Sequence, residues 1–216
     1  MILAAGRGSR LRPLTDTTPK PMLPIGGKPL IEWQIEKLAA AGVTGVVINL
    51  HHLGEQIREH LDDGSRFDLE IAYSEESALL ETGGGVVQAL PLLGDEPFWL
   101  LNGDIWSDFD FTTLPQTPPG GNKAAHIVLT PTPGHRDGDF DFADGWVTQR
   151  GAGYVYCGIA LYTPQLFGGE RPLVFSLRDL LFDLLAQQRL SGQIHSGEWH
   201  DIGNLDQYQQ LQSRSR

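Results

Sequence analysis

Short apolar runs alternate with helical patterns through the first half of the chain, and this order constrains the fold more than any other feature. The segment Pro29–Ala41 has apolar residues at helical spacing, a proline in its first turn and Gly42 after its end. The expected strands are Met1–Ala4, Gly45–Leu50, Leu69–Tyr73 and Phe98–Asn102, and the other expected helices are Glu55–Leu61 and about Gly84 to Leu90. A β-α-β-α order predicts a mainly parallel sheet with helices on both faces.

The second half of the chain has a different pattern. Its apolar segments are joined by turns such as Asp144-Gly145, which predicts antiparallel strands. The segments are Ala125–Thr130, Phe140–Val147 and Tyr154–Leu161, followed by an amphipathic helix over Leu177–Leu190 and a last helix from about Leu205. We therefore expect one α/β domain over residues 1–216, with a Rossmann-like mixed, mainly parallel sheet flanked by helices.

Composition indicates the cellular compartment of the protein and argues against a zinc site. The single cysteine, Cys157, can form no internal disulfide, which favours a reducing compartment, and no Cys/His cluster has the spacing of a zinc site. The apolar stretch Met1–Ala5 is too short for a signal-peptide core, and no later run approaches the length that spans a bilayer. We expect a cytoplasmic protein.

The net charge of −11 argues against a nucleic-acid or anionic-membrane partner, because both normally require a basic face. Positive charge is nevertheless concentrated near the N-terminus. Among the first 28 residues one acid, Asp16, accompanies five cations, which are Arg7, Arg10, Arg12, Lys20 and Lys28. Glycines and prolines restrict the backbone around these cations, which favours a site for a small polyanion over a solvated basic loop.

The segment Leu3–Thr15 (LAAGRGSRLRPLT) leaves the first strand and contains Gly6 and Gly8. Glycines in such a loop let backbone N–H groups turn toward an anion and approach it closely. A dinucleotide fingerprint would need glycine where Leu11 stands, and the Gly-Lys-Ser/Thr of a Walker A loop is absent. The loop is therefore a candidate phosphate site of another kind.

A second cationic segment follows at Thr18–Pro24 (TPKPMLP). Two prolines hold the chain extended on either side of Lys20 and limit where its ammonium group points. Lysine is a point charge suited to a polyphosphate, whereas Arg10 offers a planar fork to two phosphate oxygens. The alternative is a proline-rich connection with an exposed lysine.

The two segments together, G-x-G-S-R-L-x-P-L-T and then P-K-P-M-L-P, resemble the signature of the nucleotide-sugar pyrophosphorylases. The resemblance implies a fold of the nucleotide-diphospho-sugar transferase type, with a nucleotide-binding half over about 1–110 and a sugar-binding half over about 111–216. It also implies that Arg10 and Lys20 are catalytic, with Lys20 on phosphate at the reacting centre. The triphosphate would be held by Ala5, Gly6, Gly8, Ser9, Arg10 and Lys20.

Leu80–Gly85 (LETGGG) leads into the third expected helix. Successive glycines allow a flat ring to lie on the backbone, although a tight turn at the start of a helix explains them equally well. The resemblance implies that this segment, with Thr82, Gly83 and Gly84, binds the base and ribose.

Two aspartates are candidate metal ligands. Asp104 follows the strand Phe98–Asn102, and ligands of open α/β sheets gather at the carboxyl ends of strands. Asp201 lies in W-H-D-I-G, and each aspartate alone has the simpler explanation of a turn residue. The resemblance implies that Asp104 and Asp201 together bind Mg²⁺, which proteins hold with one or two carboxylates, phosphates and water.

The sugar site is expected around His135–Phe140 and Tyr156–Ile159, and the resemblance assigns to it Asn102, Gly138, Asp139 and Gly158. One feature departs from the family. Many members carry a Glu-x-Lys-like element whose lysine binds the sugar phosphate, whereas Trp146–Tyr154 contains only Arg150 as a cation.

The resemblance implies transfer of a nucleoside monophosphate from a nucleoside triphosphate to a sugar 1-phosphate, with small molecules as the partners. L-E-T-G-G-G, F-W-L-L-N-G-D-I-W, P-G-H-x-x-G-D-F and W-x-D-I-G most resemble the N-acetylmuramate α-1-phosphate uridylyltransferases of cell-wall recycling. Thymidylyl transfer to glucose 1-phosphate and guanylyl transfer to mannose 1-phosphate remain open. So do two readings from other classes, a non-catalytic nucleotide-sugar-binding regulator and a nicotinamide-dependent oxidoreductase.

Overall fold

The computed structural model describes residues 1–121, 124–134, 136–170 and 172–214. The chain forms two compact units that are interleaved in sequence. Unit 1 comprises Met1–Leu79, Asn102–Thr113 and Trp199–Arg216, and unit 2 comprises Leu80–Leu101 and Leu114–Glu198. The expected halves that meet at about residue 110 remain a prediction about which substrate each part binds.

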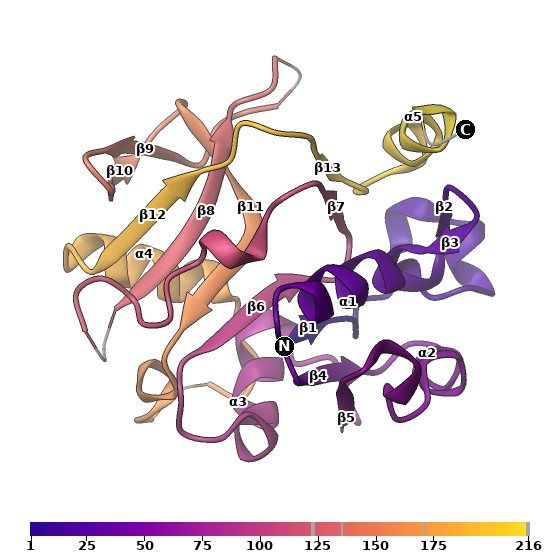
Figure 1. The fold of residues 1–216 in the computed structure, drawn as a ribbon. Helices are drawn as coiled ribbons and strands as arrows, with labels where there is room; N and C mark the ends of the chain where they lie inside the picture. Colours follow the sequence, from indigo (N-terminus) through magenta and orange to yellow (C-terminus); the bar gives the residue numbers. More distant parts are fainter. Residues whose placement is uncertain (122–123, 135, 171, 215–216) are drawn as a thin grey trace. The chain divides into compact units, whose positions relative to one another are not determined.

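Unit 1 is built on three parallel strands in the order β5-β4-β1 (Figure 1). They are β1 (Ile2–Leu3), β4 (Gly45–Leu50) and β5 (Glu70–Glu75), accompanied by the helices α1 (Leu30–Ala40), α2 (Gly54–Leu61) and α5 (Leu205–Arg214). Ile2 pairs with Ile48 on β4, and both side chains are fully buried. The continuous apolar run of β4 is typical of a strand that is covered on both faces.

Two small antiparallel ladders complete unit 1. The strand β2 (Pro24–Ile25) pairs with β3 (Lys28–Pro29), and β7 (Ile105–Ser107) pairs with β13 (Trp199–Asp201). An apolar cluster of unit 1 joins the first of these ladders to the C-terminal segment, and its buried members are Leu11, Leu23, Ile25, Leu30, Ile202, Tyr208 and Leu211. Segments that begin the chain and end it therefore share one core.

Unit 2 contains a mixed sheet in the order β6-β11-β8-β12-β10-β9. The strands are β6 (Phe98–Asn102), β8 (Ala125–Pro131), β9 (Phe140–Ala143), β10 (Trp146–Arg150), β11 (Tyr154–Tyr162) and β12 (Leu190–Ile194). Its helices are α3 (Glu81–Leu93) and α4 (Leu177–Ala186), and α4 packs against β10 and β12 (Figure 1). Within this sheet β8 and β12 are parallel, and the pairs β6–β11, β8–β11 and β9–β10 are antiparallel.

The expected α/β architecture with a mixed sheet and flanking helices is confirmed. Two expected elements have different bounds. Phe140–Val147 is not one strand, because Asp144 and Gly145 adopt φ values of 51° and 85° and form the turn between β9 and β10. The helix expected over Leu177–Leu190 ends at Ala186, because Gln188 has a left-handed φ of 54° and Leu190 already pairs with Ala125 in the sheet.

The helix expected from about Gly84 begins earlier, at Glu81, and continues through Pro91 to Leu93. No helix within the described part of the chain combines the length and the apolar character that crossing a membrane requires.

Candidate active site

The predicted phosphate loop leaves β1 with its backbone held at both ends. The Ala4 N–H donates to Asn49 Oδ1 at 2.8 Å in a buried contact. Gly8 has a φ of 60°, and a β-carbon there would lie 2.8 Å from Thr15 Cγ2. The Thr15 hydroxyl in turn donates to the Gly8 carbonyl at 2.9 Å. Close packing against Thr15 therefore requires glycine at position 8.

Side chains from β4, from α2 and from the turn between them contact this loop and the residues that follow it. Asn49 Nδ2 donates to Glu76 Oε1 at 2.6 Å, and both side chains are buried. His52 Nε2 donates to the Thr15 carbonyl and Gln56 Nε2 to the Thr17 carbonyl, each at 2.9 Å. None of these polar residues was singled out from the sequence, because nothing in the local pattern shows that they meet residues about 40 positions earlier.

Lys20 and Asp104, both predicted site residues, form an ion pair. The Lys20 ammonium nitrogen donates to Asp104 Oδ2 at 2.5 Å, and the Lys20 side chain is only 10% exposed, against 32% for Asp104. Lys20 begins a short 3₁₀ turn over Lys20–Met22 whose first residues are buried. The predicted alternative, an exposed lysine in a proline-rich connection, is wrong.

The turn that carries Asp104 passes very close to the end of β1. The Gly103 N–H donates to the Leu3 carbonyl at 2.9 Å, and a β-carbon on Gly103 would lie 2.4 Å from that same oxygen. Only glycine fits there without displacing backbone. Asp104 is thus presented beside the residues that open the phosphate loop.

The β7–β13 ladder brings Asp201 to the same region. Asp201 pairs with Ile105, and the Ile202 N–H donates to the Asp104 carbonyl at 3.0 Å. The Arg10 side chain reaches the same segment, since a β-carbon on Gly203 would lie 3.3 Å from Arg10 Nη1 and 3.6 Å from Asp201 Oδ1. Unit 1 therefore gathers the predicted catalytic cations and the predicted metal ligands from four separate stretches of sequence.

The donor set suits a hard cation that shares its shell with other oxygen ligands. Asp104 directly precedes β7, Asp201 ends the paired strand β13, and both residues are partly exposed. Within the described ranges, no group of three or more His, Cys, Asp or Glu side chains has the arrangement of a metal site. Two carboxylates fit Mg²⁺, which usually keeps several waters and binds substrate phosphates.

The glycines at the start of α3 have a packing role in unit 2. The N–H groups of Gly83 and Gly84 both donate to the Phe175 carbonyl, at 2.9 and 3.3 Å. A β-carbon on Gly83 would lie 2.3 Å from the Phe175 ring, and Thr82 Oγ1 accepts the Leu177 N–H at 2.8 Å. Close packing against the segment after residue 172 is thus a sufficient reason for glycine at these positions. Their role in binding the base remains a prediction.

Of the predicted sugar residues in unit 2, Asp139 has the most contacts. Its Oδ2 accepts the Tyr156 N–H at 3.0 Å and lies 3.6 Å from Arg136 Nη2. Gly138 packs on the backbone of Ala152, where a β-carbon would lie 2.5 Å from the carbonyl carbon.

Gly158, the other predicted sugar residue of unit 2, has a φ of 73°, within the register shift of β11 between Tyr156 and Ala160. The neighbouring Cys157 is buried, and burial raises the pKa of its thiol well above the usual value. His135 lies outside the described residues. Arg150, the cation considered for the sugar phosphate, lies over the Phe182 ring at 4.5 Å.

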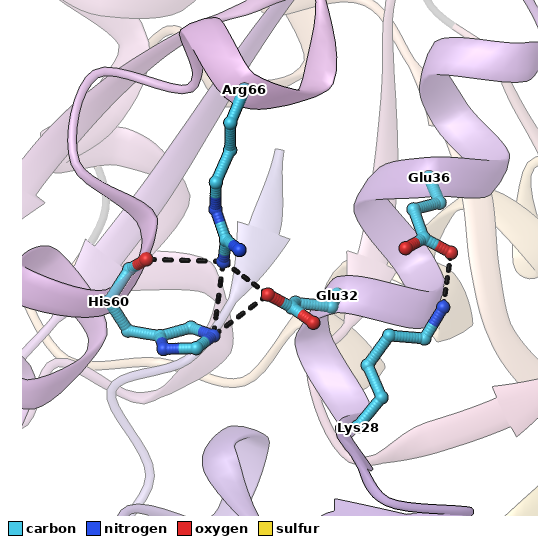
Figure 2. Close-up of polar contacts among 5 residues, drawn as sticks. All are labelled: Lys28, Glu32, Glu36, His60 and Arg66. Carbon is cyan, nitrogen blue, oxygen red and sulfur yellow. Dashed lines mark hydrogen bonds and ion pairs between the residues drawn. The ribbon is translucent and has the colours of Figure 1, made fainter.

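A further polar cluster, which the sequence did not suggest, anchors α1 (Figure 2). Glu32 is 7% exposed and accepts a hydrogen bond from Arg66 Nη2, while His60 Nε2 lies 2.8 Å from the same carboxylate oxygen. Arg66 also donates to the His60 carbonyl at 3.1 Å, and Lys28 pairs with Glu36 on the outer side of the helix. These contacts tie α1 to α2 and to the Ser65–Phe67 turn.

Comparison with known proteins identifies the family. A family model described as Nucleotidyl transferase matches residues 1–140. N-acetylmuramate alpha-1-phosphate uridylyltransferase of Neisseria meningitidis serogroup B is 46% identical over 99% of this chain and 96% of its own length. The enzyme of the same name from Caulobacter vibrioides is 33% identical over 94% and 91%. UTP–glucose-1-phosphate uridylyltransferase of Synechocystis is 40% identical, over 62% of this chain and 37% of its own length.

Solved structures agree on the fold. The crystal structure of HddC from Yersinia pseudotuberculosis superposes with a TM-score of 0.80 at 22% identity, covering 100% of this chain and 98% of that one. A Bacillus anthracis protein assigned to the glucose-1-phosphate thymidylyltransferases gives a TM-score of 0.84 at 22% identity, covering 100% and 94%. With the phosphate loop, the Lys20–Asp104 pair and the family match over most of its length, the chain belongs to the nucleotidyl transferase family.

Proposed function

We propose that this protein transfers UMP from UTP to N-acetylmuramate α-1-phosphate, giving UDP-N-acetylmuramate and pyrophosphate, in the recycling of cell-wall sugars in the cytoplasm. The observation that carries the proposal is the similarity, over nearly the full length of both chains, to two enzymes with that activity in their names. The contacts among the loop, Lys20 and Asp104 support it, because they suit a triphosphate.

The reaction needs no protein nucleophile. A phosphate oxygen of the sugar 1-phosphate attacks the α-phosphorus of UTP, and the bond from that phosphorus to the β-phosphate oxygen breaks, releasing pyrophosphate. A phosphate monoester is already largely a dianion near neutral pH, since its second pKa is about 6, so no general base is required. The protein then contributes position and charge.

The residues of unit 1 have distinct roles in this proposal. The backbone from Ala5 to Arg10 cradles the triphosphate, and Arg10 neutralises its charge. Lys20 binds the α-phosphate, where negative charge builds up in the transition state. Its ammonium lies against Asp104, so an anion on Lys20 and a cation on Asp104 would be neighbours.

Asp104 and Asp201 would hold Mg²⁺. When bound, the ion supplies electrostatic stabilisation to the phosphoryl oxygens and orients the leaving pyrophosphate. The backbone bond from Ile202 to Asp104 keeps the two carboxylate-bearing segments in fixed register, so that neither aspartate has to be recruited from a mobile loop.

Unit 2 would recognise the acceptor and the base. The 3-O-lactyl carboxylate of N-acetylmuramate needs a cation or N–H donors, since a buried unpaired carboxylate is costly. Arg136 is half-buried beside Asp139 and is the cation proposed for this role, together with backbone N–H groups near Gly138. In unit 2, Asp139 and Gly158 would contact the sugar, and Thr82, Gly83 and Gly84 the uridine. Asn102, which belongs to unit 1, is also proposed to contact the sugar.

A pyrophosphate-release assay over a grid of substrates tests the proposal. Four nucleotides (UTP, dTTP, GTP and ATP) are combined with the 1-phosphates of N-acetylmuramate, N-acetylglucosamine, glucose and mannose. N-acetylglucosamine 1-phosphate is the matched control, because it lacks only the lactyl group. We expect UTP with N-acetylmuramate 1-phosphate to give a kcat/KM at least about tenfold above every other pair. A higher value with glucose 1-phosphate or mannose 1-phosphate would overturn the substrate assignment and leave the reaction class standing.

A further inference from the structure

We propose that Gln34 is a positioning residue that orients Asp104 by holding both ends of the turn that carries it. The inference rests on the proposed function, in which Asp104 is a metal ligand. Gln34 lies on α1 and is 5% exposed. It was not among the residues that the sequence indicated.

The contacts of its amide group are specific. Gln34 Nε2 donates to the Asn102 carbonyl and to the Ile105 carbonyl, both at 2.9 Å. A side-chain amide nitrogen carries two hydrogens, so both are used. The two acceptors flank Gly103 and Asp104, which means that one nitrogen atom closes the turn from both sides.

Other contacts fix the remainder of the same turn. The Gly103 N–H donates to Leu3, and the Asp104 carbonyl accepts from Ile202. With Gln34 in place, the turn is held from α1, β1 and β13 at once. These bonds restrain the backbone from which the Asp104 side chain extends toward Lys20, which it meets at 2.5 Å.

If position 34 served only for packing, an apolar residue would stabilise the fold better than glutamine. Its neighbours Ile31, Ile35 and Leu38 on the same helix are almost fully buried apolar residues. Gln34 Oε1 is buried and has no hydrogen-bond partner among the described residues. A buried acceptor without a partner lowers stability, because its desolvation is not compensated, and an apolar side chain would avoid that cost. The two donors are what an apolar residue could not supply.

The helix that carries Gln34 is itself anchored. Glu32 lies two residues earlier on α1, buried against Arg66 and His60 (Figure 2). A donor on a helix fixed in this way can set the position of its acceptors. Residues that orient a metal ligand in this manner affect metal affinity or activity by about 10–100-fold when replaced.

The test compares Gln34→Met, which keeps the length of the side chain and removes both donors, with Ile35→Val on the same helix. Mn²⁺ affinity is titrated by electron paramagnetic resonance in the presence of UTP and without acceptor, so that no turnover is needed. We expect Gln34→Met to weaken Mn²⁺ binding by about tenfold and Ile35→Val to leave it unchanged. Gln34→Glu, which replaces the NH₂ donor group by an acceptor, should weaken binding at least as much and serves if the methionine variant does not fold.

A double-mutant cycle separates this role from a merely structural one. In an Asp104→Asn background, Gln34→Met should cause little further loss of Mn²⁺ affinity, because the residue through which it acts is already altered. Undiminished affinity in Gln34→Met, or an equal loss in both backgrounds, overturns the role of Gln34 while the proposed function stands. A wild-type protein that binds no Mn²⁺ with UTP overturns the metal role of Asp104 and, with it, this inference.

Discussion

Lys20 Nζ lies 2.5 Å from Asp104 Oδ2, although the two residues are 84 positions apart in the chain. The pair joins the second cationic segment, Thr18–Pro24, to the turn that follows Asn102. It places a group suited to phosphate beside a group suited to a metal ion. In the proposed reaction both partners act on the same phosphoryl group.

Replacing Lys20 should lower kcat far more than it raises KM. In Lys20→Met the charge on the transferring phosphoryl group loses its nearest protein cation, and removal of one such group typically costs about 10²–10³ in kcat. Steady-state kinetics at saturating UTP measure the effect, with Lys28→Met as the control, since Lys28 pairs with Glu36 on the outer side of α1. An unchanged kcat with a raised KM for UTP would assign Lys20 to ground-state binding.

Asp104→Asn and Asp201→Asn should each remove most turnover and leave the fold intact, because each replaces a charged ligand of a partly hydrated ion by a neutral one. Circular dichroism and the melting temperature verify the fold, and activity is measured as a function of Mg²⁺ concentration. Asp110→Asn is the matched control, since Asp110 caps its own turn through Thr112. Near-normal activity at limiting Mg²⁺ in either site variant would show that the residue is not a ligand.

Gly83→Ala should destabilise unit 2 by roughly 1–3 kcal/mol, because its new methyl group meets the Phe175 ring. Chemical denaturation measures the loss. Adding Phe175→Ala should give a double variant more stable than the sum of the single effects predicts, since the small side chain relieves the clash. If Gly83→Ala instead keeps its stability and loses affinity for UTP, the glycine serves the nucleotide and not the packing.

Stability should fall in mildly acidic solution, and His126 should account for part of the change. Burial lowers the pKa of His126 from its ordinary value of 6.5, although the bond to Gln193 opposes the shift. Between the lowered native pKa and 6.5 the unfolded chain binds more protons, so the free energy of unfolding decreases as pH falls through this range.

The measurement is denaturant unfolding from pH 7.5 downward. His126→Gln, which cannot gain a proton, should lose less stability over the same interval than the wild type does. A slope identical in the two proteins would show that other groups cause the acid sensitivity.

Local sequence patterns predict those helices, strands and candidate site residues that can be recognised from their immediate neighbours in the chain. Each of these features can be recognised from a short stretch of sequence. Examples are the apolar run of β4, the glycines of the phosphate loop and the proline-flanked Lys20. The same holds for Asp104 at the end of a strand and for the family signature that unites these segments. Helical and strand periodicity depend on neighbours in the chain, and this is why the α/β class was predictable.

Only the tertiary structure shows which distant segments contact one another. Gln34 meets Asn102 across 68 positions, and Asn49 reaches back to Ala4 across 45. Phe175 fills the space that Gly83 leaves, and Leu190 leaves the helical pattern because it pairs with Ala125 in the sheet. A single polar residue in an apolar helix face gives no sign of its partner, since hydrogen bonds depend on distance in space and not on spacing along the chain. For this reason the sequence could indicate the groups that carry charge, and only the packed structure shows what holds Asp104 in place.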